Sequence, residues 1–530
     1  MPAENGVVYT KRWVVDMILD LSGYIPGSGI VDKTIVEPSC GCGAFMTVIA
    51  ERLSSEVLSC GREWGEIAGS VRGFEIDPEA IAVTKSSVAA VLEQNGCPED
   101  TATAIADAWI TLDDFILSDV PSCDFVAGNP PYVRATEIDR EKRDRYCDAL
   151  DCMTSGCDLY IGFFDKGLDI LREGGVLCFI CADRWLQNSY GKCLRGRVGK
   201  KCHIADLVRM HGVDAFDEMV DAYPAVTLIR KEPAAEPLRF VNCSSDFSGD
   251  DVGAVMEWLS NPCGPKIGDR YQAFEVSRPN GADVYSLGDI ETVSFVSEAR
   301  EKLPDLKEAG VRIGIGIATG CDDVFLTEDE NVAEPSRMLP IFHMRDYRRG
   351  HAERKRWLVN PWNDDGTLVD IDEYPKMKAY FESNSERLRA RHVAKKSGGC
   401  WYRTIDKVIP GLADRDLLLM PDMAAQPDPV LSHGLYPHHN CYWISSDEWD
   451  LPALGGILMA DTTRRFIDAQ GVKMRGGTLR FQAQYLKLVR IPRYSEVAIG
   501  VREGLREAFE ARDREKATRF AEMAYKEAMR

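Results

Sequence analysis

The stretch Thr34-Ile-Val-Glu-Pro-Ser-Cys-Gly-Cys-Gly-Ala-Phe45 joins a short β-branched run to a segment with helical spacing. Gly41 and Gly43 let the backbone turn tightly and approach a ligand closely, because glycine has no Cβ. The N-terminus of the helix that follows favours negative charge, such as a ligand carboxylate. Glu37, at the end of the predicted strand, is placed to accept hydrogen bonds from a ligand ammonium. The stretch therefore predicts a strand–turn–helix unit, which either binds a ligand or is an ordinary structural turn.

The alternation of strand and helix continues through the first 230 residues. Amphipathic segments such as 78–93 and 158–172 separate short, apolar, β-branched runs. These runs occupy residues 34–36, 71–76, 124–127, 176–181, 204–210 and 225–229. Strands that alternate with helices predict an α/β fold, with a doubly wound, mostly parallel, Rossmann-like sheet. Ligands of such sheets bind at the carboxyl ends of the strands.

Acidic residues follow two further predicted strands. Glu75 is placed to bind both hydroxyls of a ribose, and Asp77 is placed to cap the helix that begins at Pro78. Glu75 lies further from Gly43 than the usual spacing, which predicts an inserted loop at residues 54–68. Asp107 could accept a hydrogen bond from the exocyclic amine of adenine, although a solvated loop aspartate explains it better.

The most specific signature is Asn129-Pro130-Pro131-Tyr132, which follows the apolar run 124–127. Two prolines restrict the backbone, so the Pro130 carbonyl and the Asn129 side-chain oxygen can face one point. The ring of Tyr132 can stack on a planar group beside that point. Two acceptors and a stacking ring suit a planar amine whose two hydrogens must be held. A structural turn would seldom use this tetrapeptide.

Together these signatures resemble those of a known family, the gamma-class N6-adenine DNA methyltransferases of type II restriction–modification systems. The family's order of motifs is matched by Thr10, Glu37–Phe45, Glu75–Asp77, Asp107 and Asn129–Tyr132. The resemblance is strong over residues 6–230 and looser afterwards. Four later pieces resemble the family's target-recognition domain: 314–325, 339–346, 401–403 and 476–481. Lys11 departs from the family, which more often has proline after the threonine, and this weakens the inference about Thr10.

The resemblance implies that S-adenosylmethionine is the cofactor. The family pattern places Thr10 and Glu37 near its methionine moiety. It places Glu75 on the ribose and Asp107 on the adenine. The other cofactor-binding positions implied by the motifs are Cys40, Gly41, Gly43, Ile76 and Ala108.

The resemblance also implies methyl transfer to the N6 amine of an adenine that is flipped out of duplex DNA. Acceptors at Asn129 and Pro130 would hold the two hydrogens of this weakly nucleophilic amine, so catalysis would consist mainly of alignment and electrostatics. Tyr132 would stack on the flipped base. The family also uses a second aromatic ring, and in segment 215–224 we favour Phe216 over Tyr223 for it.

The charge of the chain speaks at first against a DNA substrate. Its 530 residues carry 64 basic and 84 acidic side chains, a formal net charge of −20. The charge is unevenly spread, because residues 1–250 carry 24 basic and 40 acidic side chains and residues 451–500 carry 8 and 3. We therefore expect a basic cleft between two domains. The candidate DNA-binding residues are Arg345, Arg348, Arg349, Lys473, Arg475 and Arg480.

The pattern along the chain predicts three segments. Residues 1–235 would form the methyltransferase domain, 236–495 a mixed α+β target-recognition domain, and 496–530 a C-terminal helical tail. No long apolar stretch and no signal peptide are present, so no membrane association is expected. We expect a cytoplasmic, nucleoid-associated monomer of a bacterium or archaeon that acts on double-stranded DNA, with any cognate restriction endonuclease as a separate protein.

Cysteines and histidines are not expected to bind a metal. The 17 cysteines predict reduced thiols, because they are few for the length and no secretion signal accompanies them. Cys178 and Cys181 lie inside an apolar run without a second pair, which indicates buried thiols. A polar loop explains a last group of side chains better than a metal site: His433, His438, His439 and Cys441.

Other functions remain as alternatives. An amino-group methyltransferase acting on RNA or on a protein glutamine would resemble the first domain, but such enzymes are much shorter. An N4-cytosine enzyme would usually have serine in place of Asn129. A fused nuclease is disfavoured, because motif residues begin by Gly6 and no convincing Asp…Glu-x-Lys set follows. A DNA-binding relic without turnover would not need to keep Asn129 and Tyr132.

Overall fold

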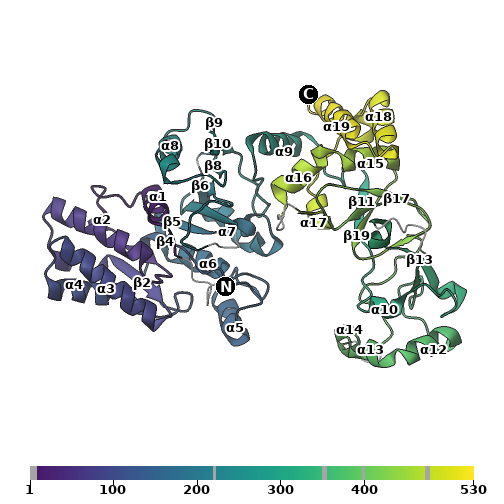
Figure 1. Cartoon of the computed structure of the whole chain (residues 1–530), viewed down its shortest axis with the longest axis horizontal. Coiled ribbons are helices and arrows are strands. Elements are labelled where there is room, and N and C mark those ends of the chain that lie inside the picture. Colours follow the sequence, from purple (N-terminus) through teal and green to yellow (C-terminus); the bar gives the residue numbers. More distant parts are fainter. Residues whose placement is uncertain (1–8, 219–222, 235, 349–354, 397–399, 472–477) are drawn as a thin grey trace. The chain divides into compact units, whose positions relative to one another are not determined.

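The computed structural model describes residues 9–218, 223–234, 236–348, 355–396, 400–471 and 478–530. The chain folds into two compact units, Met1–Val293 and Ser294–Arg530 (Figure 1). Among the residues described, no helix combines the length and apolar character needed to cross a membrane.

The first unit is built on one ten-stranded sheet. In spatial order its strands are β3 (Ile110–Leu112), β2 (Val71–Glu75), β1 (Ile35–Glu37), β4 (Cys123–Gly128), β5 (Leu171–Ala182), β7 (Pro224–Arg230), β6 (His203–Arg209), β8 (Leu238–Cys243), β10 (Tyr271–Val276) and β9 (Lys266–Ile267). The first five are parallel, and β7 runs antiparallel between β5 and β6. The predicted doubly wound, mostly parallel sheet is confirmed.

Helices cover both faces of this sheet. One hydrophobic core includes residues of α1 (Arg12–Ser22), α2 (Ala44–Cys60), α3 (Pro78–Gln94), α4 (Glu99–Trp109) and α8 (Gly249–Ser260). The other includes residues of α5 (Arg140–Ala149), α6 (Tyr160–Ile170) and α7 (Lys192–Lys201). Side chains of β5 alternate between the two cores, as the pleat of a strand requires. Cys178 therefore faces one core and Cys181 the other, so the two thiols are buried apart.

Two expected boundaries differ from the structure. The first unit continues past residue 235 to Val293, because β8 pairs in parallel with β6 and extends the same sheet. Residues 54–68 are not a loop, because α2 runs to Cys60 and a 3₁₀ helix spans Trp64–Gly69. Val57 and Ile67 in this region are buried in the core, which explains why the segment is helical.

The cysteines differ from the expectation of fully reduced thiols at one pair. Cys152 and Cys193 form a disulfide with their Cα atoms 5.2 Å apart, and the remaining cysteines are free. Cys193 lies in α7, and Cys152 lies between α5 and α6.

The described residues of the second unit form three small sheets. One is antiparallel, with the order β11 (Val311–Ile315), β19 (Cys441–Ser446), β15 (Leu417–Pro421) and β17 (Val430–Ser432). A mixed sheet has the order β12 (Leu326–Thr327), β14 (Trp357–Val359), β13 (Met338–Phe342) and β18 (Tyr436–Pro437). The last pairs β16 (Met423–Ala424) with β20 (Leu479–Arg480).

Helices of the second unit fall into two groups. One shares a core with the antiparallel sheet: α9 (Ile290–Lys302), α15 (Leu451–Met459), α16 (Asp461–Gln470), α17 (Ala483–Leu486), α18 (Ile499–Glu510) and α19 (Arg514–Ala528). The others lie between β11 and β15 in the sequence: α10 (Asp322–Phe325), α11 (Met344–Arg348), α12 (Pro375–Ser383), α13 (Ser385–Ala390) and α14 (His392–Lys396). The tail from residue 496 contains the two helices α18 and α19. Leu505 of α18 and Tyr525 of α19 are buried in that core, so both helices pack onto it.

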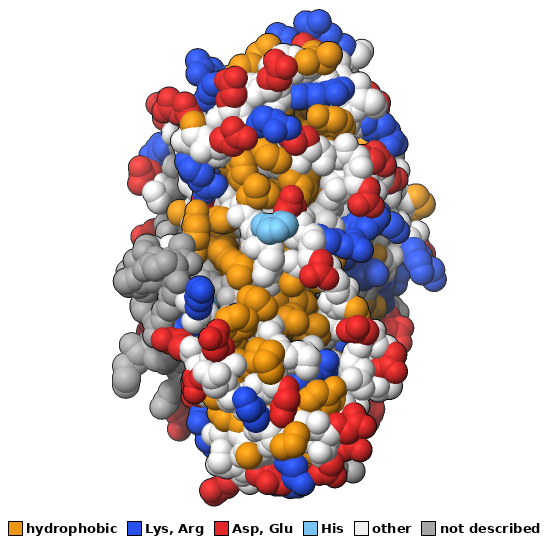
Figure 2. Space-filling view, turned by 90° about the vertical axis from the view of Figure 1, so that its right-hand side faces the viewer, with side chains coloured by type: hydrophobic (Ala, Val, Ile, Leu, Met, Phe, Trp, Pro, Cys, Tyr) orange, Lys and Arg blue, Asp and Glu red, His pale blue; other side chains and the backbone are white. Residues whose placement is uncertain are grey.

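Charged side chains of both signs are mixed on the surface. On the face drawn in Figure 2, apolar side chains run down the middle, and basic and acidic side chains are interspersed around them. Many charges are paired locally in the second unit, for example Arg387 with Asp323 at 2.8 Å. Exposed pairs of this kind contribute little stability but lower the local field.

Candidate active site at the carboxyl ends of β1 and β4

The residues of the two strongest signatures meet at the carboxyl ends of β1 and β4. These strands are parallel neighbours, although two other strands lie between them in the sequence. The sheet order reverses at this point, which is where ligands of doubly wound sheets bind. Gly128 ends β4, and a Cβ on it would lie 2.7 Å from Oε1 of Glu37. Only glycine therefore lets the two strand ends approach this closely.

Glu37 is a carboxyl group that forms no ion pair with the side chains described in the structure. Its side chain is fully buried, and Oε1 accepts a hydrogen bond from the Ser39 amide at 3.2 Å. Oε2 is buried and has no hydrogen-bond partner among the described residues. Burial away from water raises the pKa of Glu37 to about 8. Such a group fits a ligand that brings a positive charge and N–H donors.

The glycine turn after β1 packs against the end of β2. Gly41 and Gly43 have φ values of 51° and 94°, a backbone region that residues other than glycine rarely adopt. The Gly41 amide donates to Oε2 of Glu75 at 2.9 Å, and the amides of Ile76 and Asp77 donate to Oε1 at 2.8 and 3.0 Å. The Glu75 carboxylate is therefore fixed at the strand end by three backbone donors.

Two neighbouring residues have structural parts in this turn. Asp77 caps α3 by accepting from the Glu79 amide at 2.9 Å, which confirms the predicted cap. Cys40 is buried, and a Cβ on Gly73 would lie 2.5 Å from its sulfur. Burial raises the pKa of the Cys40 thiol well above its usual value. The Cys40 side chain thus packs the turn onto β2 as a neutral thiol.

Asn129 and Tyr132 lie beside residues from two other segments. The Asn129 amide Nδ2 donates to Oγ1 of Thr10 at 3.1 Å. Thr10 forms a β-bridge with Phe216, and the Lys11 amide extends this contact by donating to the Ala215 carbonyl at 3.1 Å. Lys11 has the backbone N–H that a proline at this position would lack, so the departure from the family adds a contact beside Thr10.

The two expected aromatic rings also meet here. The ring centroids of Tyr132 and Phe216 are 6.1 Å apart, and the rings are nearly perpendicular at 81°. Phe216 is 5% exposed and belongs to the core on that side of the sheet. Tyr223, the weaker candidate, packs instead against His211 with ring centroids 4.8 Å apart.

The expectation for Asp107 and Ala108 is wrong about their position. Both lie inside α4, before β3 begins at Ile110, so they precede the strand instead of following it. Asp107 is exposed and pairs with Lys85 at 2.9 Å. Helix and strand are continuous here, and no turn residue marks the change.

The carboxyl end of β3 carries residues that the sequence analysis missed. Asp113 follows the strand, and its amide donates to the Glu75 carbonyl at 3.0 Å. Leu112 ends β3, and Ile76 directly follows the neighbouring strand β2; their side chains are 56% and 57% exposed. Exposed apolar side chains beside an acidic residue suit a planar ring that carries an amine. The signal available in the sequence was the β-branched run at 110–112 followed by an aspartate.

The structure describes three of the candidate DNA-binding residues. Arg345 lines a cavity in the second unit. Arg348 donates to the Met423 carbonyl at 3.0 Å, and Arg480 pairs with Asp422 at 2.6 Å. The remaining candidates, Arg349, Lys473 and Arg475, lie outside the described residues.

The sheet order, the glycine turn and the Asn-Pro-Pro-Tyr signature define an α/β methyltransferase. A family model described as Eco57I restriction-modification methylase matches residues 70–216. Type II methyltransferase M.PaeR7I of Pseudomonas aeruginosa is 38% identical over 96% of this chain and 89% of its own length. Type II methyltransferase M.XhoI of Xanthomonas vasicola is 36% identical over 99% of this chain and 98% of its own length. The chain belongs to the type II DNA methyltransferases of restriction–modification systems.

A solved structure resembles the whole chain in fold. The type IIL restriction–modification enzyme MmeI, determined in complex with DNA, matches 98% of this chain and 71% of its own, with a TM-score of 0.55. The sequence identity is 14%, so the likeness concerns the fold. It extends over both units, which agrees with the match of M.XhoI along the full chain.

Proposed function

We propose that the protein transfers a methyl group from S-adenosylmethionine to N6 of an adenine in duplex DNA. The observation that carries the proposal is the position of Asn129-Pro-Pro-Tyr132 at the end of β4, beside Glu37, Thr10 and Phe216. The N6 amine offers two hydrogens and a flat ring, which are the features that two acceptors and an aromatic side chain recognise.

The polar groups at the neighbouring strand ends fit the cofactor. Oε2 of Glu37 is suited to the ammonium of the methionine moiety, and the Glu75 carboxylate to the ribose hydroxyls. We assign the adenine of the cofactor to the exposed Ile76 and Leu112, with Asp113 in place of Asp107. When bound, S-adenosylmethionine supplies an electrophilic methyl group on its sulfonium.

Asn129 and Pro130 would orient the amine that receives the methyl group. Thr10 accepts a hydrogen bond from the Asn129 amide nitrogen, and this contact fixes the orientation of the amide. The amide oxygen then becomes the atom that accepts from the substrate amine, together with the Pro130 carbonyl. Holding both hydrogens favours a more tetrahedral nitrogen, whose lone pair is less delocalised into the ring. The nitrogen becomes acidic once methylated, so no strong base is needed.

Tyr132 and Phe216 would hold the flipped base. Stacked bases are about 3.4 Å apart, so a base between two parallel rings needs about 7 Å between the ring centres. The observed separation of 6.1 Å at 81° is too small for that arrangement. We propose that the base stacks on Tyr132 and turns the ring of Phe216 aside.

The second unit would read the DNA sequence, and the enzyme would act as a monomer beside a separate restriction endonuclease. The test is to express the chain in a bacterial host that lacks DNA methylation and to map modified bases by long-read sequencing. We expect N6-methyladenine at every copy of one short motif, and none with the Asn129→Ala variant. N4-methylcytosine instead, or soluble protein without any modified motif, would refute the proposal.

A further inference from the structure

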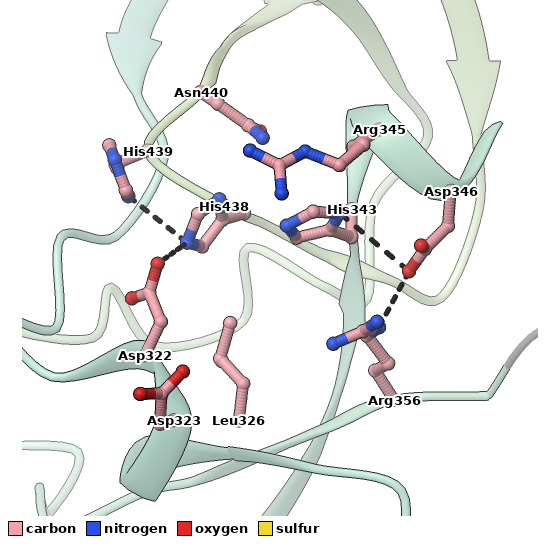
Figure 3. Close-up of a pocket in the computed structure, with 10 residues that line it drawn as sticks. All are labelled: Asp322, Asp323, Leu326, His343, Arg345, Asp346, Arg356, His438, His439 and Asn440. Atoms are coloured by element: carbon pink, nitrogen blue, oxygen red, sulfur yellow. Dashed lines mark hydrogen bonds and ion pairs between the residues drawn. The ribbon is translucent and has the colours of Figure 1, made fainter. Parts of the chain in front are cut away.

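The second unit contains a cavity of about 540 Å³ where several segments meet (Figure 3). It is lined from the start of α10 and of β12, the residues around α11, Arg356 just before β14, and the turn between β18 and β19. The lining side chains are polar except for one leucine, and they are Asp322, Asp323, Leu326, His343, Arg345, Asp346, Arg356, His438, His439 and Asn440.

Three of these side chains direct lone-pair atoms at one point. Nε2 of His438 lies 3.0 Å from Oδ2 of Asp322 and 3.0 Å from Nδ1 of His439. All three atoms lie within 4.8 Å of one another. Figure 3 shows both contacts converging on the same ring nitrogen of His438.

Hydrogen bonding alone satisfies this arrangement poorly. A neutral imidazole carries one proton on one of its two nitrogens, and an ionised carboxylate carries none. If Nε2 of His438 holds the proton, two acceptors must share it. If Nδ1 of His439 holds it instead, the lone pair of Nε2 faces Asp322. In both arrangements lone pairs are left opposed, whereas one cation at the centre would accept all three.

We infer that Asp322, His438 and His439 form a binding site for a divalent transition-metal ion of the zinc type. A metal with bonds of about 2.0–2.2 Å holds neighbouring ligand atoms about 3.0–3.5 Å apart at angles between 90° and tetrahedral. The two contacts of 3.0 Å match this spacing. Two imidazole ligands favour zinc, cobalt or nickel over magnesium or calcium, which prefer oxygen.

The surroundings of the three ligands suit a cation. Three carboxylates line the cavity, those of Asp322, Asp323 and Asp346. They outnumber the two guanidinium groups of the lining, which belong to Arg345 and Arg356. The side-chain oxygen of Asn440 is buried and has no hydrogen-bond partner among the described residues. It lines the same cavity, so it can complete the coordination directly or through a metal-bound water.

The site differs from the group of residues that the sequence had brought to attention. His433 is exposed and pairs with Asp416, and the buried thiol of Cys441 donates to the His438 carbonyl. Asp322 joins the two remaining histidines from 116 residues away. A metal here would fix the turn between β18 and β19 to the start of α10.

The test is a zinc titration of the full chain without a polyhistidine tag, monitored by calorimetry. A phosphine in the buffer keeps the thiols reduced. Thiols are zinc ligands and this chain has free cysteines, so the readout is the difference in zinc uptake between variants. The ligand variant is His439→Ala, whose exposed side chain can be removed without disturbing the core. The matched control is His433→Ala, an exposed histidine whose side chain is 80% accessible.

We expect the wild type and His433→Ala to bind one zinc ion more than His439→Ala, and to gain thermal stability from it. Cobalt(II) should give the visible absorption bands of nitrogen and oxygen coordination with the wild type and His433→Ala. These bands should be absent with His439→Ala. Asp322→Asn should behave like His439→Ala. Equal zinc stoichiometry in His439→Ala and wild type, or no saturable uptake by the wild type, would overturn the inference. These outcomes do not depend on the proposed methyl transfer.

Discussion

The strand-end site of the first unit and the cavity of the second unit both collect polar side chains from distant segments, but by different means. In the first unit each motif follows a strand of one parallel sheet, so the topology itself brings the motifs together. In the second unit, Asp322 begins the short helix α10, and His438 lies on the turn between two short strands, β18 and β19. A sequence signature predicts geometry only where a regular architecture fixes which element ends meet.

The two regions also treat their central carboxyl groups differently. Glu37 is fully buried, and this burial raises its pKa to about 8. Asp322 accepts a hydrogen bond from His438, and its pKa is lowered to about 2. Burial alone favours the neutral acid, whereas a hydrogen-bonded partner favours the charged one. At neutral pH the first group is therefore mainly protonated, whereas the second is ionised.

The largest effect is expected from Asn129→Ala, which tests whether one strand-end motif carries the reaction. Removal of the oriented acceptor should lower the rate of methyl transfer by about 100-fold or more, as loss of a single preorganised group does in other enzymes. Cofactor affinity, measured by calorimetry, should change by less than about threefold. The exposed Asn280→Ala serves as the control and should keep full activity. Near-full transfer by Asn129→Ala would remove Asn129 from the mechanism.

Glu37→Gln should weaken binding of S-adenosylmethionine by roughly 10- to 100-fold, since a hydrogen bond to a charged group contributes about 1.5–3 kcal/mol. The dissociation constant from calorimetry measures this effect. A variant that binds the cofactor as tightly as the wild type would show that Oε2 of Glu37 does not meet the ammonium.

The same substitution should stabilise the ligand-free protein in a pH-dependent manner. The pKa of Glu37 is about 8 in the folded chain against an ordinary value of 4.5. The carboxyl therefore costs stability increasingly as the pH rises from 4.5 to 8, because folding then disfavours its ionised form. Thermal unfolding should show little difference between Glu37→Gln and wild type at pH 5, and a higher melting temperature of the variant by a few degrees at pH 8. A pH-independent difference would contradict the assignment.

The positions of Glu37, Glu75 and Asn129 could be predicted because each follows an apolar run that becomes a sheet strand. The position of Asp107 could not be predicted, because α4 passes directly into β3 without a turn residue. The alternation of apolar and polar residues around Asp107 also resembles that of a strand end. The boundary at 235 failed for a related reason. A short segment rich in proline and glutamate resembles a linker, although β8 behind it pairs with β6.

The convergence of Asp322 with His438 and His439 had no local signal at all. The contact depends on the pairing of β18 with β13. β18 is only two residues long, and it pairs in parallel with β13, whereas the other strand pairs of this sheet are antiparallel. Short strands carry too little periodicity to be recognised, and their partners are not set by a repeated rule. Phe216 was predicted from the resemblance to the family, because the residues next to it in the sequence indicate no function by themselves.

Asp113→Ala should weaken cofactor binding by about tenfold, since one hydrogen bond contributes about 1 kcal/mol or somewhat more. Asp107→Ala is the matched control, and it removes only an exposed ion pair with Lys85. Its cofactor affinity should stay within about twofold of the wild type. The reverse ranking of the two variants would restore Asp107 to the site and imply a different register for β3.

The smallest effect is expected from Thr10→Val, which keeps the shape of the side chain but removes the acceptor of the Asn129 amide. Net loss of such a hydrogen bond costs about 0.5–1.5 kcal/mol, or roughly a 2- to 12-fold lower turnover. Because Thr10 would act by orienting Asn129, turnover should fall while the Michaelis constant for the cofactor stays nearly unchanged. Thr10→Ser, which keeps the hydroxyl, should recover most of the rate. A rise in the Michaelis constant for the cofactor with unchanged turnover would instead place Thr10 against the methionine moiety, as the family pattern implies.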